Sequence, residues 1–305
     1  MNPSDSDEAS EPPRALTPIA CDIPLDILRV IFELSARSSS QMAWRLSLVS
    51  RLVNHWMDAV IYGVIWINSQ RQAEKLAKTL QSKPKTCQRI KVLAIPYGVS
   101  HTTAATILPL CVNLEGLACW ASKPLSIPSI LTLSAMRRLS LNICGSDGLF
   151  IQPDFSARLF TSITHLELCD IERAWLQWHG FEHMQDLTHL SVYWHDRQKY
   201  PLSSLIPFVT RVFDACAKVR ALVINGREFP EDTSTEGLRI FHDPRVIVMR
   251  DEVDPPMGFR YEWEAQWFAE PCIWDTANEI VALQETLQWD TLRCPEPDSD
   301  DVDET

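Results

Sequence analysis

Three residues in the middle of the chain have types and spacing that could hold a metal ion. His179, Glu182 and His183 stand in the order His-x-x-Glu-His, in which two imidazoles could bind zinc while the carboxylate acts as a general base. That arrangement needs both imidazoles on one face of a helix, and Gly180 lowers helix propensity by about 1 kcal/mol relative to alanine. We therefore interpret the segment as a connection between two strands and expect no metal site.

A nucleophilic set could also be assembled from Cys169, Asp170 and His165. Cys169 ends an apolar run, where a thiol is usually buried and inert. The chain lacks a Gly-x-Ser-x-Gly motif, a phosphate-binding glycine loop and a dinucleotide-binding glycine turn, and it has only nine glycines. We expect no catalytic residue and no cofactor, so the sequence predicts that the protein is not an enzyme.

Charge and composition restrict the classes of partner. Of the 305 residues, 46% are hydrophobic, so the chain can bury a substantial core. Half of the net charge of -12 comes from one acidic stretch near the C-terminus, and the rest of the chain is mildly acidic. The residues of that stretch are Glu296, Asp298, Asp300, Asp301, Asp303 and Glu304. Since no stripe of Lys and Arg interrupts this balance, we expect no nucleic-acid partner.

Cysteine usage and hydropathy predict a cytoplasmic or nuclear protein. The nine cysteines are an odd number, are widely scattered and never occur as Cys-x-x-Cys, which indicates reduced thiols. The first residues are acidic and polar, whereas a signal peptide needs basic and then apolar residues. No run reaches the ~18 apolar residues of a membrane span, so we expect no membrane partner.

Changes in composition divide the chain into five predicted segments. Both ends are too polar to offset the entropy of ordering them, so we expect disordered acidic tails there. The segments are residues 1–20 (tail), 21–68 (helical), 69–250 (repeated β/α units), 251–292 (aromatic loop and C-terminal capping helix) and 293–305 (tail).

Two amphipathic helices are expected in the second segment. The first begins at Ile23 and Pro24 and runs to Leu34, with apolar residues at steps of three and four. The second carries an apolar stripe at four-residue spacing from Trp44 to Val60. So short a helical pair has little interior, and its apolar surface must be covered by the rest of the chain or by a partner.

The third segment contains an apolar-x-x-apolar-x-apolar pattern six times, in steps of 24, 22, 27, 24 and 32 residues. The copies are Ile90/Leu93/Ile95, Leu114/Leu117/Cys119, Met136/Leu139/Leu141, Ile163/Leu166/Leu168, Leu187/Leu190/Val192 and Val219/Leu222/Ile224. These steps centre on the leucine-rich-repeat period and predict a mixed α/β fold, an irregular repeat solenoid with a parallel sheet. The asparagine that usually closes each turn is missing, and a leucine-rich β/α protein of another topology remains an alternative.

Two further elements are expected after the repeats. We predict a last strand from Asp243 to Arg250. We also predict a helix from Trp274 to Trp289 that caps the open end of the sheet.

The helical segment resembles the F-box. Ile23 to Leu34 matches its opening, an apolar-Pro pair followed by an Ile-Phe-x-x-Leu segment, and Leu46 to Trp56 is similar to its second half. Ile61 to Ile67, Asp243 to Arg245 and Ile273-Trp274 extend the resemblance to the F-box-like proteins that are abundant in mushroom-forming (basidiomycete) fungi.

This resemblance implies a substrate-recognition adaptor of a Skp1-cullin-F-box ubiquitin ligase, acting in ubiquitin-dependent degradation. The F-box would dock on a Skp1-type adaptor and through it on a cullin, while the repeats bind an unknown protein substrate. The implied Skp1 contacts are Ile23, Pro24, Leu25, Ile27, Leu28, Ile31, Phe32, Leu48, Val49, Arg51 and Leu52. The alternative is an F-box-containing scaffold or interaction protein outside any ligase, which a covered ridge from Leu25 to Phe32 would favour.

Four tryptophans are candidate substrate contacts, because they fall just after predicted strands or in loops, where aromatic anchors of binding surfaces often lie. They are Trp120, Trp194, Trp263 and Trp267. The alternative is that these rings fill an irregular core.

Overall fold

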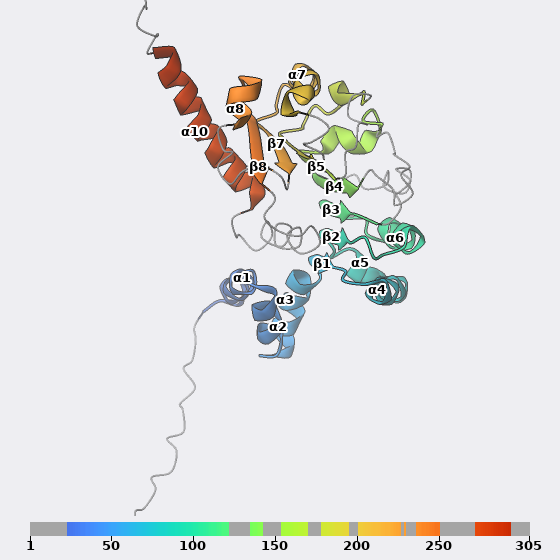
Figure 1. Ribbon diagram of the computed structural model, residues 1–305. Helices are drawn as coiled ribbons and strands as arrows, with labels where there is room; N and C mark the ends of the chain where they lie inside the picture. The colour runs from blue at the N-terminus through green and yellow to red at the C-terminus, as the bar shows by residue number, and fades with distance from the viewer. Residues whose placement is uncertain are drawn as a thin grey trace, which may run out of the picture.

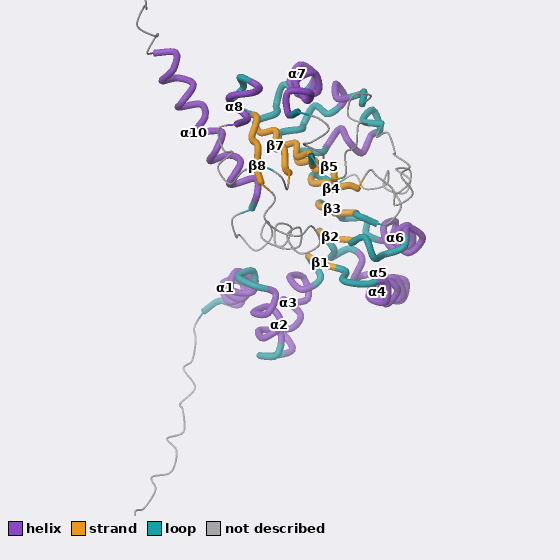
Figure 2. Tube along the Cα trace, viewed as in Figure 1, coloured by secondary structure: helices purple, strands orange, loops and turns teal. Residues whose placement is uncertain are grey.

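Eight short strands form one parallel sheet in the computed structural model, and they follow one another in chain order (Figures 1 and 2). The strands are β1 Val64–Trp66, β2 Val92–Ile95, β3 Gly116–Cys119, β4 Arg138–Asn142, β5 His165–Cys169, β6 His189–Tyr193, β7 Ala221–Gly226 and β8 Val246–Arg250. The structure describes residues 23–121, 135–142, 154–169, 178–194, 201–226, 229, 236–250 and 272–293. The predicted mixed α/β class and parallel sheet are confirmed.

A repeated hydrogen-bond pattern at the start of each strand sets the register. The Arg137 carbonyl accepts from the N–H groups of Thr164 and His165 at 2.8 and 3.1 Å, and the Thr164 carbonyl accepts in the same way from Thr188 and His189. The carbonyls of Gly63, Lys91, Glu115 and Thr188 make equivalent pairs. The Thr164 hydroxyl also donates to the Arg137 carbonyl, and the Thr188 hydroxyl donates to the Thr164 carbonyl, both at 3.0 Å. Each of these threonines therefore ties the start of its strand to the residue before the preceding strand.

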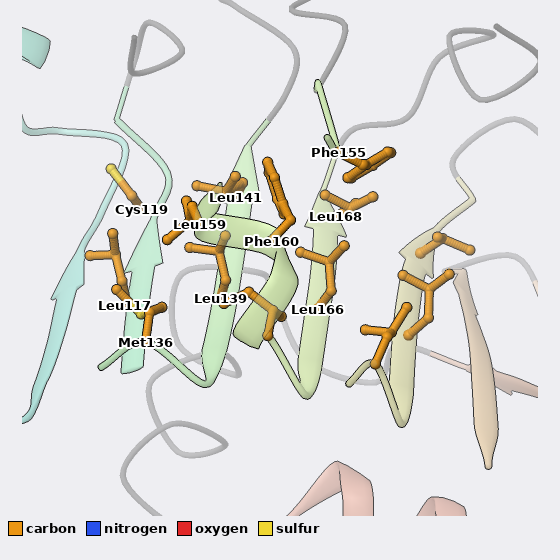
Figure 3. Packing of buried hydrophobic residues seen from close by; sticks show 14 of the residues in the cluster. Leu117, Cys119, Met136, Leu139, Leu141, Phe155, Leu159, Phe160, Leu166 and Leu168 are labelled. Atoms are coloured by element: carbon orange, nitrogen blue, oxygen red, sulfur yellow. The ribbon is translucent and has the colours of Figure 1, made fainter. Parts of the chain in front are cut away.

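Every predicted apolar triplet ends in a strand, and its apolar side chains face the hydrophobic core between the sheet and the connecting segments. We call this core the repeat core. Leu139, Leu166 and Leu190 are in register on β4, β5 and β6, and all are buried. Figure 3 shows Leu139 and Leu166 on the same side of the strands as Leu159 and Phe160 of a connecting segment. Alternation along a strand sends every second residue to this core face, which explains why the triplet pattern located the strands.

The connecting segments lie together on the core face of the sheet (Figure 1). They are α4 Gln70–Ser82, α5 Pro84–Cys87, α6 His101–Ile107, η1 Leu108–Leu110, η3 Arg158–Ser162, η5 Phe181–His183, η6 Leu202–Leu205, α7 Ile206–Ala215 and α8 Glu236–Phe241. Several are single 3-10 turns and others are longer helices, so the described connections differ from one to the next.

The N-terminal segment forms three helices, α1 Leu25–Ala36, α2 Ser40–Ser47 and α3 Arg51–Ile61. The prediction of one helix from Trp44 to Val60 was wrong, because the chain breaks at Leu48 to Ser50. The Ser50 hydroxyl accepts from the Val53 N–H at 3.1 Å and starts a new helix. This cap divides the four-residue stripe between two helices that present different faces.

The last helix, α10 Ile273–Arg293, packs on the face of the sheet opposite the repeat core. Its Trp274, Ala277 and Val281 are buried against Ala221, Val223 and Ile247 of β7 and β8. Figures 1 and 2 show α10 and the connecting segments on different sides of the strands. The helix was predicted, but it covers a face of the sheet rather than capping the open end.

Other predictions concern the thiols and the ends of the chain. Six cysteines are buried and free, as predicted: Cys87, Cys111, Cys119, Cys169, Cys216 and Cys272. Cys21, Cys144 and Cys294 lie outside the described residues, as do both predicted tails except Arg293, and also the aromatic loop up to residue 271. Among the helices described, none has the length and apolar composition needed to cross a bilayer.

Candidate protein-docking site

The three N-terminal helices have a small core of their own. Ala36, Ala43, Val53, Trp56 and Met57 are buried in it. Leu28 and Phe32 of α1 are half-buried against this core, and the Phe32 and Trp56 rings lie 6.2 Å apart between centroids. This core holds one face of α1 on α2 and α3.

A second, opposite face of α1 is apolar and exposed. Ile27, Val30, Ile31 and Leu34 lie at helical spacing, and their exposed fractions are between 46% and 64%. Contiguous exposed apolar patches on a protein surface mark interaction sites. The outward face of α1 therefore has the composition of an interface without a described partner.

A second exposed apolar group lies where α2 gives way to α3. Leu48 is 84% exposed, Val49 is 60% exposed and Leu52 is 48% exposed, while Trp44 on α2 is 59% exposed. We call these residues, together with those of α1, the docking surface. Its members are Ile23, Leu25, Ile27, Val30, Ile31, Leu34, Trp44, Leu48, Val49 and Leu52.

The structure leaves nine of the eleven predicted Skp1 contacts exposed: Ile23, Pro24, Leu25, Ile27, Ile31, Leu48, Val49, Arg51 and Leu52. Leu28 and Phe32 are half-buried, because they also hold α1 on its own core. Val30, Leu34 and Trp44 are exposed members that the sequence reasoning did not assign. The signal for Val30 and Leu34 was present, since each follows Ile27 or Val30 at the spacing of one helical face.

A short link joins the helices that carry the docking surface to the sheet. Helix α3 ends at Ile61 and β1 begins at Val64, and the Gly63 carbonyl between them accepts from the N–H groups of Lys91 and Val92. Arg89 Nη1 lies 2.7 Å from Asp58 Oδ2 of α3. These short links place the N-terminal helices at the β1 end of the sheet (Figure 1).

Two of the predicted substrate contacts are buried. Trp120 is 1% exposed, donates through Nε1 to Ser140 Oγ at 2.9 Å and lies 5.8 Å from the Trp66 ring. Trp194 is 5% exposed. Neither ring is available on the surface, so we do not retain them as substrate contacts. Trp263 and Trp267 lie outside the described residues.

The His-x-x-Glu-His segment does not form the helix that its zinc chemistry would need. Gly180 has a φ of 91°, a left-handed conformation, and only Phe181 to His183 form one 3-10 turn after it. His179, Glu182 and His183 are all exposed. Among the described His, Cys, Asp and Glu residues, no group of three is arranged to hold a metal ion.

Two residues of the second catalytic candidate, His165 and Cys169, lie apart along β5. His165 and Cys169 are four residues apart on one strand, which is about 13 Å at the rise of a strand. Cys169 is buried beside Trp120 and Tyr193. The strand therefore keeps the imidazole and the thiol out of contact, and Asp170 lies outside the described residues.

The face opposite the repeat core carries a buried polar row that sequence reasoning missed. Ser140, Glu167 and Ser191 are in register on β4, β5 and β6, with exposed fractions of 0%, 7% and 0%. Trp120 donates to Ser140, and Asn225 Nδ2 donates to Ser191 Oγ at 3.0 Å. Ser140 and Ser191 thus offset their burial with hydrogen bonds, as buried polar groups must.

Two stacked imidazoles lie at the edge of this row. The His165 and His189 rings are 4.4 Å apart and nearly parallel, and the Trp274 ring of α10 meets both edge-on at 5.3 and 5.4 Å. His189 Nε2 lies 3.2 Å from Asn278 Oδ1. The pair therefore ties α10 to β5 and β6.

Comparison with known proteins adds no relative. No protein-family model matches the chain, and no curated protein matches it either.

Proposed function

We propose that this protein is an adaptor that docks through α1 to α3 on a Skp1-type protein and holds a protein substrate with its repeat domain. Through the Skp1-type protein it would join a cullin-based ubiquitin ligase. The chain itself would then perform no chemistry, because the assembly would supply catalysis by proximity.

The observation that carries the proposal is the exposed apolar ridge on helices that already have a core. Leu25, Ile31 and Leu48 are 62%, 46% and 84% exposed, although a small domain gains little by leaving such side chains in water. Their grouping on two adjoining helical elements suits a helix-in-groove interface with apolar anchors. A ridge covered by the repeat domain would have favoured a scaffold without such a partner.

Co-purification with a fungal Skp1-type protein tests the proposal. The wild type should co-elute with it in size-exclusion chromatography, and a Leu25→Asp, Leu48→Asp variant should bind at least ~100-fold more weakly, since charges would be buried at the centre of the interface. Leu28 and Phe32 are unsuitable for this test, because they pack on the core of the helices.

A matched control separates docking from general surface damage. Val112 and Ile206 are 49% and 41% exposed in the repeat domain, so Val112→Asp, Ile206→Asp makes the same chemical change elsewhere and should bind like the wild type. Circular dichroism should give both variants the melting temperature of the wild type. A wild type that elutes alone and folded would refute the ligase role and leave a scaffold.

A further inference from the structure

Three arginines stand among the exposed apolar residues of the docking surface. Arg37 follows the last residue of α1 as its C-cap, three residues after Leu34, and Arg45 lies on α2 three residues before Leu48, the C-cap of that helix. Residues at these separations are neighbours on a helix surface. Arg51 stands between Val49 and Leu52 at the start of α3. All three arginines are exposed.

None of these arginines forms an ion pair or a side-chain hydrogen bond with another residue in the described part of the chain. Other charged side chains of these helices already form ion pairs. Arg29 Nε lies 2.6 Å from Glu33 Oε1, and Asp58 is paired with Arg89.

The three cations reverse the sign of the molecule locally. The whole chain has a net charge of -12, yet among the described residues of α1 to α3 the exposed, permanently charged side chains without an ion pair are these arginines and Asp26. Single charges at an interface rim contribute little affinity, but they set the association rate and select partners of opposite sign.

We infer that the docking surface recognises a protein groove with an apolar floor and carboxylates along its border, which meet Arg37, Arg45 and Arg51. This inference rests on the proposed docking function. An anionic lipid surface would offer negative charge as well, but the strongly acidic chain would be repelled from it. The exposed apolar residues also span three helices, whereas an interfacial membrane helix presents one straight face.

Binding of a purified fungal Skp1-type protein at two salt concentrations tests the inference. Raising NaCl from about 0.05 M to about 0.5 M should weaken the wild type about tenfold, since exposed charges are screened over this range. The Arg37→Ala, Arg45→Ala, Arg51→Ala variant should bind about tenfold more weakly than the wild type at low salt and lose most of the salt dependence.

A charge-matched control lies on α4, where Arg71, Lys75 and Lys78 are exposed. Their triple alanine variant removes the same charge from another surface and should bind like the wild type. Equal loss in both triple variants would overturn the inference in favour of a general charge effect.

Other outcomes separate this inference from the proposed function. If Leu25→Asp, Leu48→Asp abolishes binding but the arginine variant binds as the wild type does, apolar docking stands and the carboxylate border is refuted. If the wild type does not bind the Skp1-type protein at all, both fall. Arginine-dependent binding to vesicles of phosphatidylcholine and phosphatidylserine, without protein binding, would replace the protein groove by a membrane surface.

Discussion

His165 and His189 illustrate how single residues in this fold depend on their neighbours. Burial lowers the pKa of His165 to about 3, with His189 and then Arg138 acting in the same direction and Asp275 opposing them. Burial also lowers the pKa of His189, against a hydrogen bond to Asn278, while Arg220 and Arg138 lower it further and Asp275 opposes them. Both rings are therefore neutral where they stack under Trp274.

This pair predicts a loss of stability in acid. An unfolded histidine has a pKa near 6.5, so the contribution of His165 is fully present above about pH 6.5 and is lost as the pH falls toward about 3. Each such group adds at most ~1.4 kcal/mol per pH unit to the slope of the unfolding free energy. Urea unfolding of His165→Phe at several pH values should give a shallower slope than the wild type.

The control for this experiment is His101→Phe, since His101 is exposed at the start of α6. That variant should keep the slope of the wild type. Equal slopes for all three proteins would mean that His165 does not carry the acid sensitivity.

At the scale of elements, spacing along the chain located most strands and helices, but their packing has contacts that no spacing reveals. Gly237 of α8 lies against β8 so closely that a Cβ there would be 2.2 Å from the Val246 carbonyl oxygen. Gly237 is required because the two elements approach so closely, and not because of its backbone conformation. Among the described glycines, the one with a left-handed conformation is Gly180.

Replacement of this glycine should therefore destabilise the fold. We expect Gly237→Ala to lower the unfolding free energy by about 1–3 kcal/mol, because α8 must move away from β8. Gly98→Ala is the matched control, since a Cβ at Gly98 would meet nothing within 4 Å. Thermal melts that show the two variants to be equally stable would contradict the close approach of α8.

At the scale of the whole molecule, the sheet is built from neighbour contacts alone. Each strand pairs with the next in the chain, from β1 with β2 to β7 with β8. In such an array stability is close to a sum of neighbouring terms, so a perturbation at one end spreads only a short way.

This organisation predicts local rather than global loosening. Trp274→Ala should cost about 3–5 kcal/mol and raise amide hydrogen exchange in β5 to β8, which Trp274 contacts, while β2 and β3 change little. Leu93→Ala in β2 should produce the reverse pattern. A uniform rise along all strands in both variants would indicate one all-or-none unit.

The sequence by itself determined the strands, their parallel order, the burial of six cysteines and the apolar ridge on α1. These follow from local periodicity, because a strand sends alternate residues to one face and a helix repeats every three or four. The break at Ser50 was missed although its capping signal is local.

The tertiary structure alone decided which surfaces meet. It placed α10 on the face opposite the repeat core, buried Trp120 and Trp194, stacked His165 on His189 and left the outward face of α1 exposed. Each outcome depends on residues far apart in the chain, whose distance is fixed by strand register and by the packing of whole elements. Periodicity indicates that a helix or strand has an apolar side, but only packing decides what covers that side.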